Sequence, residues 1–274
     1  MKDNLKISFI GGGNMASALI GGLAGKLTHG SNIHVIDINS DKLQSLQQQH
    51  GVSTAGRIDS TVEASDVIVL AVKPQQIHEV MTELAPHVSR QLILSIVAGI
   101  RAADLSRWLN GHRTIVRTMP NTPALIGQGV TGLVALDSVS QEQISQANAI
   151  MRAAGATVWL ENESQIDAVT ALSGSGPAYV FYFIEAMQQA AEAFGLSAQQ
   201  GRELAIATFT GAAQLAAQSS EPVSVLRERV TSKGGTTFAA LSSMERDDVK
   251  GAIVRAINAA QMRSKELGEE FGRG

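Results

Sequence analysis

Two stretches of this sequence are apolar at almost every position, and they constrain the fold more than any other feature. Val-Ile-Val-Leu-Ala-Val spans residues 67–72, and Leu-Ile-Leu-Ser-Ile-Val spans residues 92–97. A strand with one face in water alternates apolar and polar side chains, whereas a parallel strand that helices cover on both faces does not. We therefore expect these two stretches to be buried strands of a parallel sheet.

Short β-branched stretches alternate with amphipathic stretches over residues 5–160. The expected strands are residues 6–10, 32–36, 67–71, 92–96, 114–117, 132–135 and 156–160. The expected helices between them are residues 14–27, 40–50, 75–86, 102–109 and 141–154. This alternation predicts a doubly wound α/β sheet, the Rossmann-type architecture of a dinucleotide-binding domain.

The strand pattern ends near Glu163, and alanine-rich helical windows follow. They are residues 178–194, 198–219, 223–230, 236–244 and 249–271, with helix breaks at residues 195–197, 219–222 and 234–235. We expect an all-α second domain, with residues 1–162 in the first domain and 163–274 in the second. These helices are apolar and weakly charged, so we expect one face to be buried against a second copy of the chain.

The composition excludes several classes of partner and site. The 22 Lys and Arg nearly balance the 25 Asp and Glu, so we expect no basic surface for nucleic acid. The apolar windows are shorter than the ~18 residues of a membrane-spanning helix, so we expect no membrane partner. The sequence has no cysteine, and its six histidines lack paired carboxylates at ligand spacing, so we expect no metal site. These features fit a cytoplasmic protein with a small-molecule substrate.

A glycine-rich turn follows the first expected strand and opens the first expected helix. Gly11-Gly12-Gly13-Asn14-Met15-Ala16 fits the pattern G-x-G-x-x-A. The first glycine permits the sharp turn, the second lets a pyrophosphate approach backbone N–H groups, and the alanine lets the helix pack closely on the strand. The helix N-terminus adds N–H donors and a partial positive charge. We expect Gly11, Gly13, Asn14 and Met15 to bind a dinucleotide.

The end of the second expected strand bears on which dinucleotide is bound. Asp37 stands where an acidic residue accepts hydrogen bonds from the adenosine ribose, which favours NADH over NADPH. Asp37 is also a residue type common at strand ends and in turns. If its side chain turned away, Asn39, Ser40 and Lys42 could contact a 2′-phosphate instead.

Further loops lie at the carboxyl edge of the expected sheet, where ligands of such sheets bind. Ala71-Val72-Lys73-Pro74 follows one strand, and Ala98-Gly99 follows the next. Lys73 could serve as a catalytic acid or a phosphate contact. In the simpler alternative its backbone lines the nicotinamide pocket and Pro74 begins the next helix.

Two motifs in the second half combine small, hydroxyl and glycine residues at helix starts. Ser173-Gly174-Ser175-Gly176-Pro177-Ala178 could be ordinary helix capping, with serine at the cap and proline in the first turn. Thr231-Ser232-Lys233-Gly234-Gly235-Thr236-Thr237 is denser in donors than a helix–helix turn requires. Backbone N–H groups and hydroxyls converging at a helix start suit a carboxylate.

The sequence resembles the pyrroline-5-carboxylate reductase family in five motifs, in that family's order, over residues 5–270. They are Gly11–Ala16, Ala71–Pro74, Arg117-Thr118-Met119-Pro120-Asn121-Thr122-Pro123, Ser173–Tyr179 and Thr231–Thr237, of which the last two are the specific ones. The resemblance implies a Rossmann domain followed by a helical domain that interlocks with its mate in a homodimer. It also implies that dimers can assemble into rings.

The resemblance implies reduction of L-1-pyrroline-5-carboxylate to L-proline with NADPH or NADH, the last step of proline biosynthesis. Family members often use NADPH, and Asp37 departs from the hydroxyl, Asn or Arg side chains found there. The implied substrate residues are Ser173, Ser175, Ser232, Lys233, Gly234, Gly235, Thr236 and Thr237, and the implied dinucleotide residues are Gly11, Gly13, Asn14, Met15, Asp37, Ala71, Val72, Lys73, Pro74, Ala98, Gly99 and Asn121. Asn121 belongs to a segment that lines the crevice between domains or, equally, forms a rigid proline-containing turn.

The residues suit this chemistry. A cyclic imine with a pKa near neutrality can arrive protonated, so its reduction depends on positioning more than on acid catalysis. Positioning alone can supply roughly 7–11 kcal/mol of barrier lowering. A second half without histidine but rich in hydroxyls agrees with this, and Thr237 is the residue expected to hydrogen-bond the imine nitrogen.

Two other functions compete with this interpretation. A β-hydroxyacid dehydrogenase of the 6-phosphogluconate type needs a general base, usually a lysine, in its helical domain. The candidates Lys233, Lys250 and Lys265 lie in the donor-rich loop or on the last helices. A dinucleotide sensor without turnover would not need a second small-molecule site, which the donor-rich loop indicates.

Overall fold

A computed structural model of the chain describes residues 4–272. The strands are β1 (Ile7–Ile10), β2 (Ile33–Ile36), β3 (Ser53–Ala55), β4 (Val67–Leu70), β5 (Leu92–Ser95), β6 (Ile115–Met119), β7 (Gly129–Ala135) and β8 (Gly155–Trp159). The helices among them are α1 (Asn14–Leu23), α2 (Ser40–His50), α3 (Ile77–Leu84), α4 (Ala102–Trp108) and α5 (Gln141–Arg152). The later helices are α6 (Gln165–Val169), α7 (Gly176–Ala193), α8 (Ala198–Gln218), α9 (Val223–Arg229), α10 (Thr236–Arg246) and α11 (Val249–Phe271).

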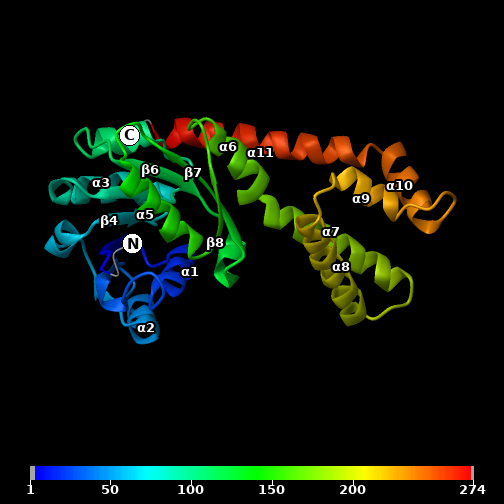
Figure 1. Ribbon diagram of the computed structural model, residues 1–274, viewed down its shortest axis with the longest axis horizontal. Coiled ribbons are helices and arrows are strands. Elements are labelled where there is room, and N and C mark those ends of the chain that lie inside the picture. The colour runs from blue at the N-terminus through cyan, green and yellow to red at the C-terminus, as the bar shows by residue number, and fades with distance from the viewer. Residues whose placement is uncertain (1–3, 273–274) are drawn as a thin grey trace. The chain divides into compact units, whose positions relative to one another are not determined.

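One sheet contains all eight of these strands, in the order β3-β2-β1-β4-β5-β6-β7-β8 (Figure 1). Every neighbouring pair is parallel except β6 and β7, which are antiparallel. The Rossmann-type expectation is therefore confirmed, with one difference at β7. Residues 120–128 are too few for the crossover that a parallel neighbour needs, so the chain turns back instead.

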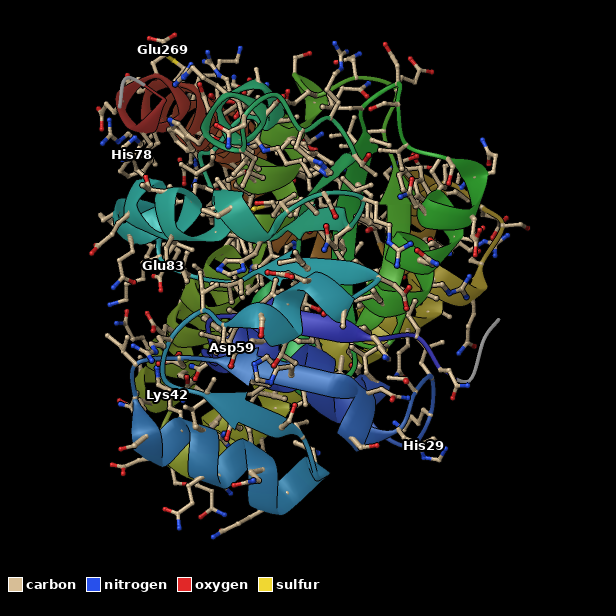
Figure 2. The ribbon with its side chains drawn as sticks, turned by 90° about the vertical axis from the view of Figure 1, so that its left-hand side faces the viewer. His29, Lys42, Asp59, His78, Glu83 and Glu269 are labelled. Carbon is tan, nitrogen blue, oxygen red and sulfur yellow. The ribbon has the colours of Figure 1, made fainter. Side chains whose placement is uncertain are left out.

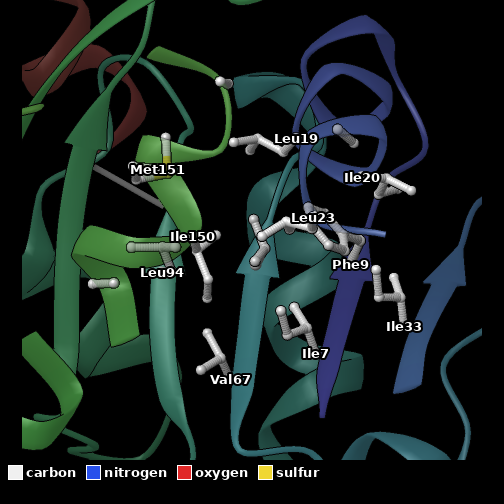
Figure 3. Packing of buried hydrophobic residues seen from close by; sticks show 14 of the residues in the cluster. Ile7, Phe9, Leu19, Ile20, Leu23, Ile33, Val67, Leu94, Ile150 and Met151 are labelled. Atoms are coloured by element: carbon white, nitrogen blue, oxygen red, sulfur yellow. The ribbon is translucent and has the colours of Figure 1, made fainter. Parts of the chain in front are cut away.

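The buried strands explain the two continuous apolar stretches. Alternate residues of β1 face opposite sides of the sheet, and both sides are covered. Ile7 and Phe9 belong to one buried cluster with side chains of α1 and α5 (Figure 3) and of α2, whereas Ile10 belongs to a second cluster with side chains of α3 and α4. Val67 and Val69 of β4 lie on the first side, and Ile68 and Leu70 lie on the second. Both faces are covered, so apolar residues can occupy consecutive positions of these strands.

Two local expectations were wrong, one about where the first helix ends and one about the number of strands. α1 ends at Leu23 rather than at residue 27, because Ala24 is extended and Gly25 has a φ of +75°. The edge strand β3 was missed, since three residues of Ser-Thr-Ala carry no detectable alternation. This strand forms because β2 lies beside it, with His34 paired to Ser53.

The described chain forms two compact units. Residues 4–175 and 260–272 form the first, and Gly176–Ala259 form the second. The expected domain boundary at residues 162 and 163 stays a prediction about sequence domains. In space, residues 163–175 and the end of α11 pack with the sheet. One such contact is the hydrogen bond from Ser264 Oγ to Asp167 Oδ1, at 2.7 Å.

The second unit contains helices only, as expected, and many of their apolar side chains are exposed in the single chain. Tyr182 of α7 is 72% exposed, and Leu204 and Leu215 of α8 are 57% and 59% exposed. Apolar surface on this scale marks an interaction site. Within residues 4–272, no helix combines the length and apolar character needed to span a bilayer.

His34 is a buried base whose charge the fold disfavours. Its Nδ1 lies 2.9 Å from Ser53 Oγ, which itself donates to the Ile33 carbonyl, so Nδ1 carries the proton. Its Nε2 has no hydrogen-bond partner among the described residues and lies 3.6 Å from Asp59 Oδ1. Burial lowers the pKa of His34 below its ordinary value, and the neighbouring Asp59 carboxylate opposes that shift only in part.

We predict that His34 makes the protein less stable in mild acid. Between the lowered pKa and the ordinary value of 6.5, the unfolded chain binds more protons than the folded one, so stability falls as pH falls. Replacing His34 with asparagine should reduce the loss of Tm between about pH 7.5 and about pH 5.5. Replacing the exposed His29 (Figure 2) with asparagine is the control and should leave that loss unchanged. Equal losses in both variants would contradict the prediction.

Candidate functional site

The turn after β1 has a backbone shape that only glycine adopts easily. Gly11 has a φ of +105°, and its N–H donates to the Ile36 carbonyl at 2.7 Å. A Cβ at Gly11 would lie 2.5 Å from the carbonyl oxygen of Ala71, which belongs to the backbone leaving β4. Glycine is therefore required here by the protein itself, because two loops at the carboxyl edge of the sheet cross at this point.

Gly13 differs from Gly11 because nothing in the protein requires it to be small. Its φ of −71° suits any residue, and a Cβ there would meet no atom within 4 Å. Gly13 is also the N-cap of α1, where no side chain caps the first N–H groups. Open space beside uncapped helix N–H groups is what the pyrophosphate of a dinucleotide needs. The residues present therefore fit such a cofactor.

A cavity of about 580 Å³ opens beside this turn. Six residues expected to bind the dinucleotide line it, namely Gly11, Gly13, Asp37, Ala71, Val72 and Lys73. Asn14, Met15, Pro74, Ala98, Gly99 and Asn121 are not among its lining residues, and their role stays a prediction. Asn14 and Met15 are the first residues of α1, and Pro74 begins a short 3-10 helix.

Asp37 is held by the backbone on both sides. Its Oδ2 accepts a hydrogen bond from the Gly12 N–H at 2.7 Å, and its Oδ1 accepts one from the Asn39 N–H at 2.8 Å. Both interpretations of this residue therefore have a structural basis. The carboxylate organises the turn, and it also lines the cavity with acceptor capacity left for ribose hydroxyls.

Basic side chains line the same cavity, and one of them was missed. Lys42 of α2 and Arg57, which follows β3, stand beside Asp37 in the lining. Figure 2 shows Lys42 and Glu83, another lining residue from α3, on one side of the domain. Arg57 is the first basic residue after the third strand, but that strand was too short to be recognised. Without β3, nothing placed Arg57 at the carboxyl edge of the sheet.

The loop after β5 packs against the end of α11. Gly99 has a φ of +74°, and a Cβ there would lie 3.2 Å from Phe271 Cδ2 and 3.4 Å from Leu267 Cβ. Glycine at this position is explained by close packing and by its backbone conformation.

An ion pair of a buried arginine in the middle of β6 was also missed. Arg117 Nη1 lies 2.9 Å from Glu163 Oε1, and the same oxygen accepts a hydrogen bond from the Ala102 N–H at 2.7 Å. The pair joins β6, the start of α4 and the segment that leaves β8. Its partners are separated by 46 residues, so no sequence spacing could reveal the pairing.

The donor-rich loop before α10 is one tight turn. Gly234 has a φ of +73°, and the Gly235 N–H donates to the Ser232 carbonyl at 3.0 Å. Gly235 is the N-cap of α10 and Thr236 and Thr237 are its first residues, with no side chain capping their N–H groups. Ser232, Lys233 and Gly234 are exposed in the single chain. The structure thus gathers hydroxyls, N–H groups and one ammonium around a single helix start.

The lysines needed by the competing dehydrogenase are exposed as well. Lys250 and Lys265 lie on exposed positions of α11. Within residues 4–272, no three His, Cys, Asp or Glu side chains are grouped closely enough to hold a metal ion.

Comparisons with known proteins connect both halves to one enzyme family. Residues 163–267 match the family model described as pyrroline-5-carboxylate reductase dimerisation, and residues 6–99 match the model for NADP oxidoreductase, coenzyme F420-dependent. The chain is 44% identical to pyrroline-5-carboxylate reductase of Pseudomonas aeruginosa over 268 residues, covering 97% of this chain and 98% of that protein. It is 40% identical to the enzyme of Haemophilus influenzae, covering 95% and 97%.

Solved structures of the same enzyme are also similar. The structure from Coxiella burnetii has a TM-score of 0.91 and 40% identity, covering 96% of this chain and 98% of that one. The structure from Plasmodium falciparum, with NADP bound, has a TM-score of 0.87 and 30% identity, covering 98% and 100%.

Proposed function

Because this chain belongs to the pyrroline-5-carboxylate reductase family and reduces L-1-pyrroline-5-carboxylate to L-proline, we propose which of its residues carry out that reaction. The observation that carries the proposal is the open space at Gly13 beside uncapped N–H groups of α1, within a cavity that also contains Asp37. The competing dehydrogenase and sensor functions are not favoured by the comparisons.

In the proposed arrangement, N–H groups at the start of α1 bind the dinucleotide pyrophosphate. Gly11 and Gly13 leave room for it, and Ala71, Val72 and Lys73 line the cavity farther along the carboxyl edge. When bound, the reduced nicotinamide supplies a hydride. The protein holds that ring against the substrate, and the positioning contributes roughly 7–11 kcal/mol to the lowering of the barrier.

We assign the substrate to hydroxyls and N–H groups of the helical region. The uncapped N–H groups of α10, with Ser232, Gly234, Gly235 and Thr236, suit the substrate carboxylate, and the ammonium of Lys233 adds an opposite charge. We assign to Thr237 the hydrogen bond to the imine nitrogen. Ser173 and Ser175 supply further hydroxyl oxygens, that of Ser173 as an acceptor, because its hydroxyl donates to the Val169 carbonyl at 3.0 Å.

A steady-state assay tests the proposal directly. Oxidation of NADH and NADPH, followed by absorbance, should require pyrroline-5-carboxylate, and the product should be proline by chromatography. Small β-hydroxyacids with the oxidised cofactors serve as the comparison substrates. Turnover of those acids without turnover of the imine would overturn the proposal.

We propose that the cavity accepts both cofactors, with Asp37 favouring NADH and the cations favouring NADPH. The Asp37 carboxylate can accept hydrogen bonds from the ribose hydroxyls, but its negative charge repels a 2′-phosphate. Lys42 and Arg57 attract that phosphate from the same lining.

Replacing Asp37 with asparagine should therefore shift the preference toward NADPH. The substitution removes the charge and keeps one acceptor oxygen for the turn. The ratio of kcat/KM for NADPH to that for NADH should rise about fivefold or more. Arg57→Ala should lower the ratio, and Glu79→Gln, an exposed carboxylate outside the cavity lining, is the control. An equal change with both cofactors in Asp37→Asn would show that this carboxylate only organises the turn.

The helical half is a dimerisation region, so the chain forms a homo-oligomer. A dimer as the basic assembly, rings of dimers and a cytoplasmic location remain proposals. The exposed apolar side chains of α7 and α8 support the first of these, because a second copy would remove them from water.

A further inference from the structure

Asn121 is a buried amide side chain that joins two segments distant in the sequence. Its Nδ2 donates to the carbonyl oxygen of Ser173 at 3.1 Å, across 52 residues. Its Oδ1 accepts from the Val130 N–H at 2.9 Å, at the start of β7. The side chain is therefore engaged through both its donor and its acceptor inside the protein.

These two hydrogen bonds take the place of the helix-capping bond that an asparagine at this position usually makes. Asn121 is the N-cap of the 3-10 helix Thr122–Ile126, where asparagine commonly accepts a hydrogen bond from an N–H of the first turn. Here the side chain makes no such bond. Pro123 in that first turn has no N–H to offer. The amide is thus available for a partner far along the chain.

The partner carbonyl lies in an unusual stretch of helix. Residues Thr170–Gly174 form a π-helical turn, closed by the hydrogen bond from the Ser175 N–H to the Thr170 carbonyl at 2.8 Å. Such turns are rare and occur often at functional sites. This one carries Ser173 and leads directly to Ser175, both assigned above to the substrate.

The sequence explains why this carbonyl needs a donor from elsewhere. In an α-helix the carbonyl of Ser173 would accept a bond from the N–H of the residue four positions later, which is Pro177. Proline has no N–H, and its ring crowds the carbonyl four residues earlier. Asn121 supplies the donor that Pro177 lacks.

A second contact joins the same two segments. A Cβ at Gly174 would lie 2.7 Å from Met119 Cε, so the Met119 side chain packs directly on the π-helical turn. The end of β6 and the segment that follows it thus hold the turn by one apolar contact and one hydrogen bond.

We propose that Asn121 is a positioning residue that orients Ser173 and Ser175 for the substrate, rather than a dinucleotide ligand. The inference rests on the proposed function, because it takes these serines as substrate contacts. It reassigns Asn121 from the dinucleotide to the other reactant. Replacing Asn121 should therefore impair the use of pyrroline-5-carboxylate and leave dinucleotide binding unchanged.

The test is Asn121→Asp, which keeps an oxygen for Val130 and places a second oxygen against the Ser173 carbonyl. At saturating NADPH, kcat/KM for pyrroline-5-carboxylate should fall about fivefold or more. The dissociation constant of NADPH, from its fluorescence, should stay within about twofold. Asn121→Ser removes both hydrogen bonds without adding charge and should show the same split if the first variant does not fold.

Pro177→Ala gives a readout that a general loss of stability would not produce. An alanine restores an N–H four residues after Ser173, so in the Asn121→Asp background it should recover about twofold or more of the lost kcat/KM. The control is Asn148→Asp, since Asn148 also bridges two elements through its Oδ1, with Thr157 and Trp159. Asn148→Asp should leave both constants unchanged.

Two results would overturn the inference. A weaker binding of NADPH with unchanged use of pyrroline-5-carboxylate would make Asn121 a dinucleotide residue. Unchanged constants throughout would show that the bond to Ser173 has no role in the site. In either case the wild-type reaction would stand, whereas failure of the wild-type enzyme to reduce the imine would contradict the proposed function instead.

Discussion

Replacing Gly13 with valine is expected to weaken NADH and NADPH binding about 100-fold or more, roughly 2.7 kcal/mol. The β-branched side chain would occupy the space beside the N–H groups of α1, where a Cβ meets no protein atom within 4 Å. The backbone there is extended, with a φ of −71° and a ψ of 179°, which valine adopts without strain. The fold should therefore keep its Tm while the cofactor is excluded.

The measurements are the dissociation constants of both dinucleotides by fluorescence and the Tm without ligand. Gly11→Ala provides the contrast, because its Cβ would press on the Ala71 carbonyl at 2.5 Å and its φ of +105° disfavours alanine. That variant should lose Tm as well as affinity. An unchanged affinity in Gly13→Val would mean that the pyrophosphate lies elsewhere.

Replacing Thr237 with alanine is expected to lower kcat/KM for pyrroline-5-carboxylate about tenfold or more, about 1.4 kcal/mol. The lost hydroxyl is the one assigned to the imine nitrogen, where its hydrogen bond holds the ring in position for hydride transfer. Dinucleotide affinity should not change, because Thr237 lies at the start of α10 and outside the dinucleotide cavity.

Two further variants separate the hydroxyl from its surroundings. Thr237→Ser keeps the hydroxyl and should retain most of the activity. Thr231→Ala removes a hydroxyl that already donates to the Arg227 carbonyl at 2.6 Å and should have little effect on kcat/KM. Equal losses in Thr237→Ser and Thr237→Ala would remove the hydroxyl from the mechanism.

Most elements of the sheet could be predicted because the relevant signals are local. Both faces of β4 and β5 are covered, so every residue in them except Ser95 is apolar, and the pattern is visible within six positions. The helix starts could be predicted for the same reason. The serine N-cap and Gln143 of α5 form a capping box within four residues.

The exceptions arose where a partner distant in the sequence decided the outcome. The strand β3 exists because β2 offers it an edge, not because Ser-Thr-Ala favours a strand. Arg57 lies in the candidate site because it follows that strand. The resemblance implied a dinucleotide role for Asn121, but its two hydrogen-bond partners are 9 and 52 residues away, so no local pattern indicated them.

The sequence by itself therefore determined the order of the strands and helices other than β3 and α6, the glycines of the first turn and the change to an all-helical second half. These features depend on periodicity and on the chemistry of neighbouring residues. Only the tertiary structure decided the antiparallel β7, the anchoring of Asp37 by Gly12 and Asn39, and the supply of a donor to Ser173 from Asn121. The antiparallel pairing of β7 follows from a link too short for a crossover. The other two follow from backbone groups that have no hydrogen-bond partner in their own helix or turn, and residues from elsewhere in the chain supply those partners.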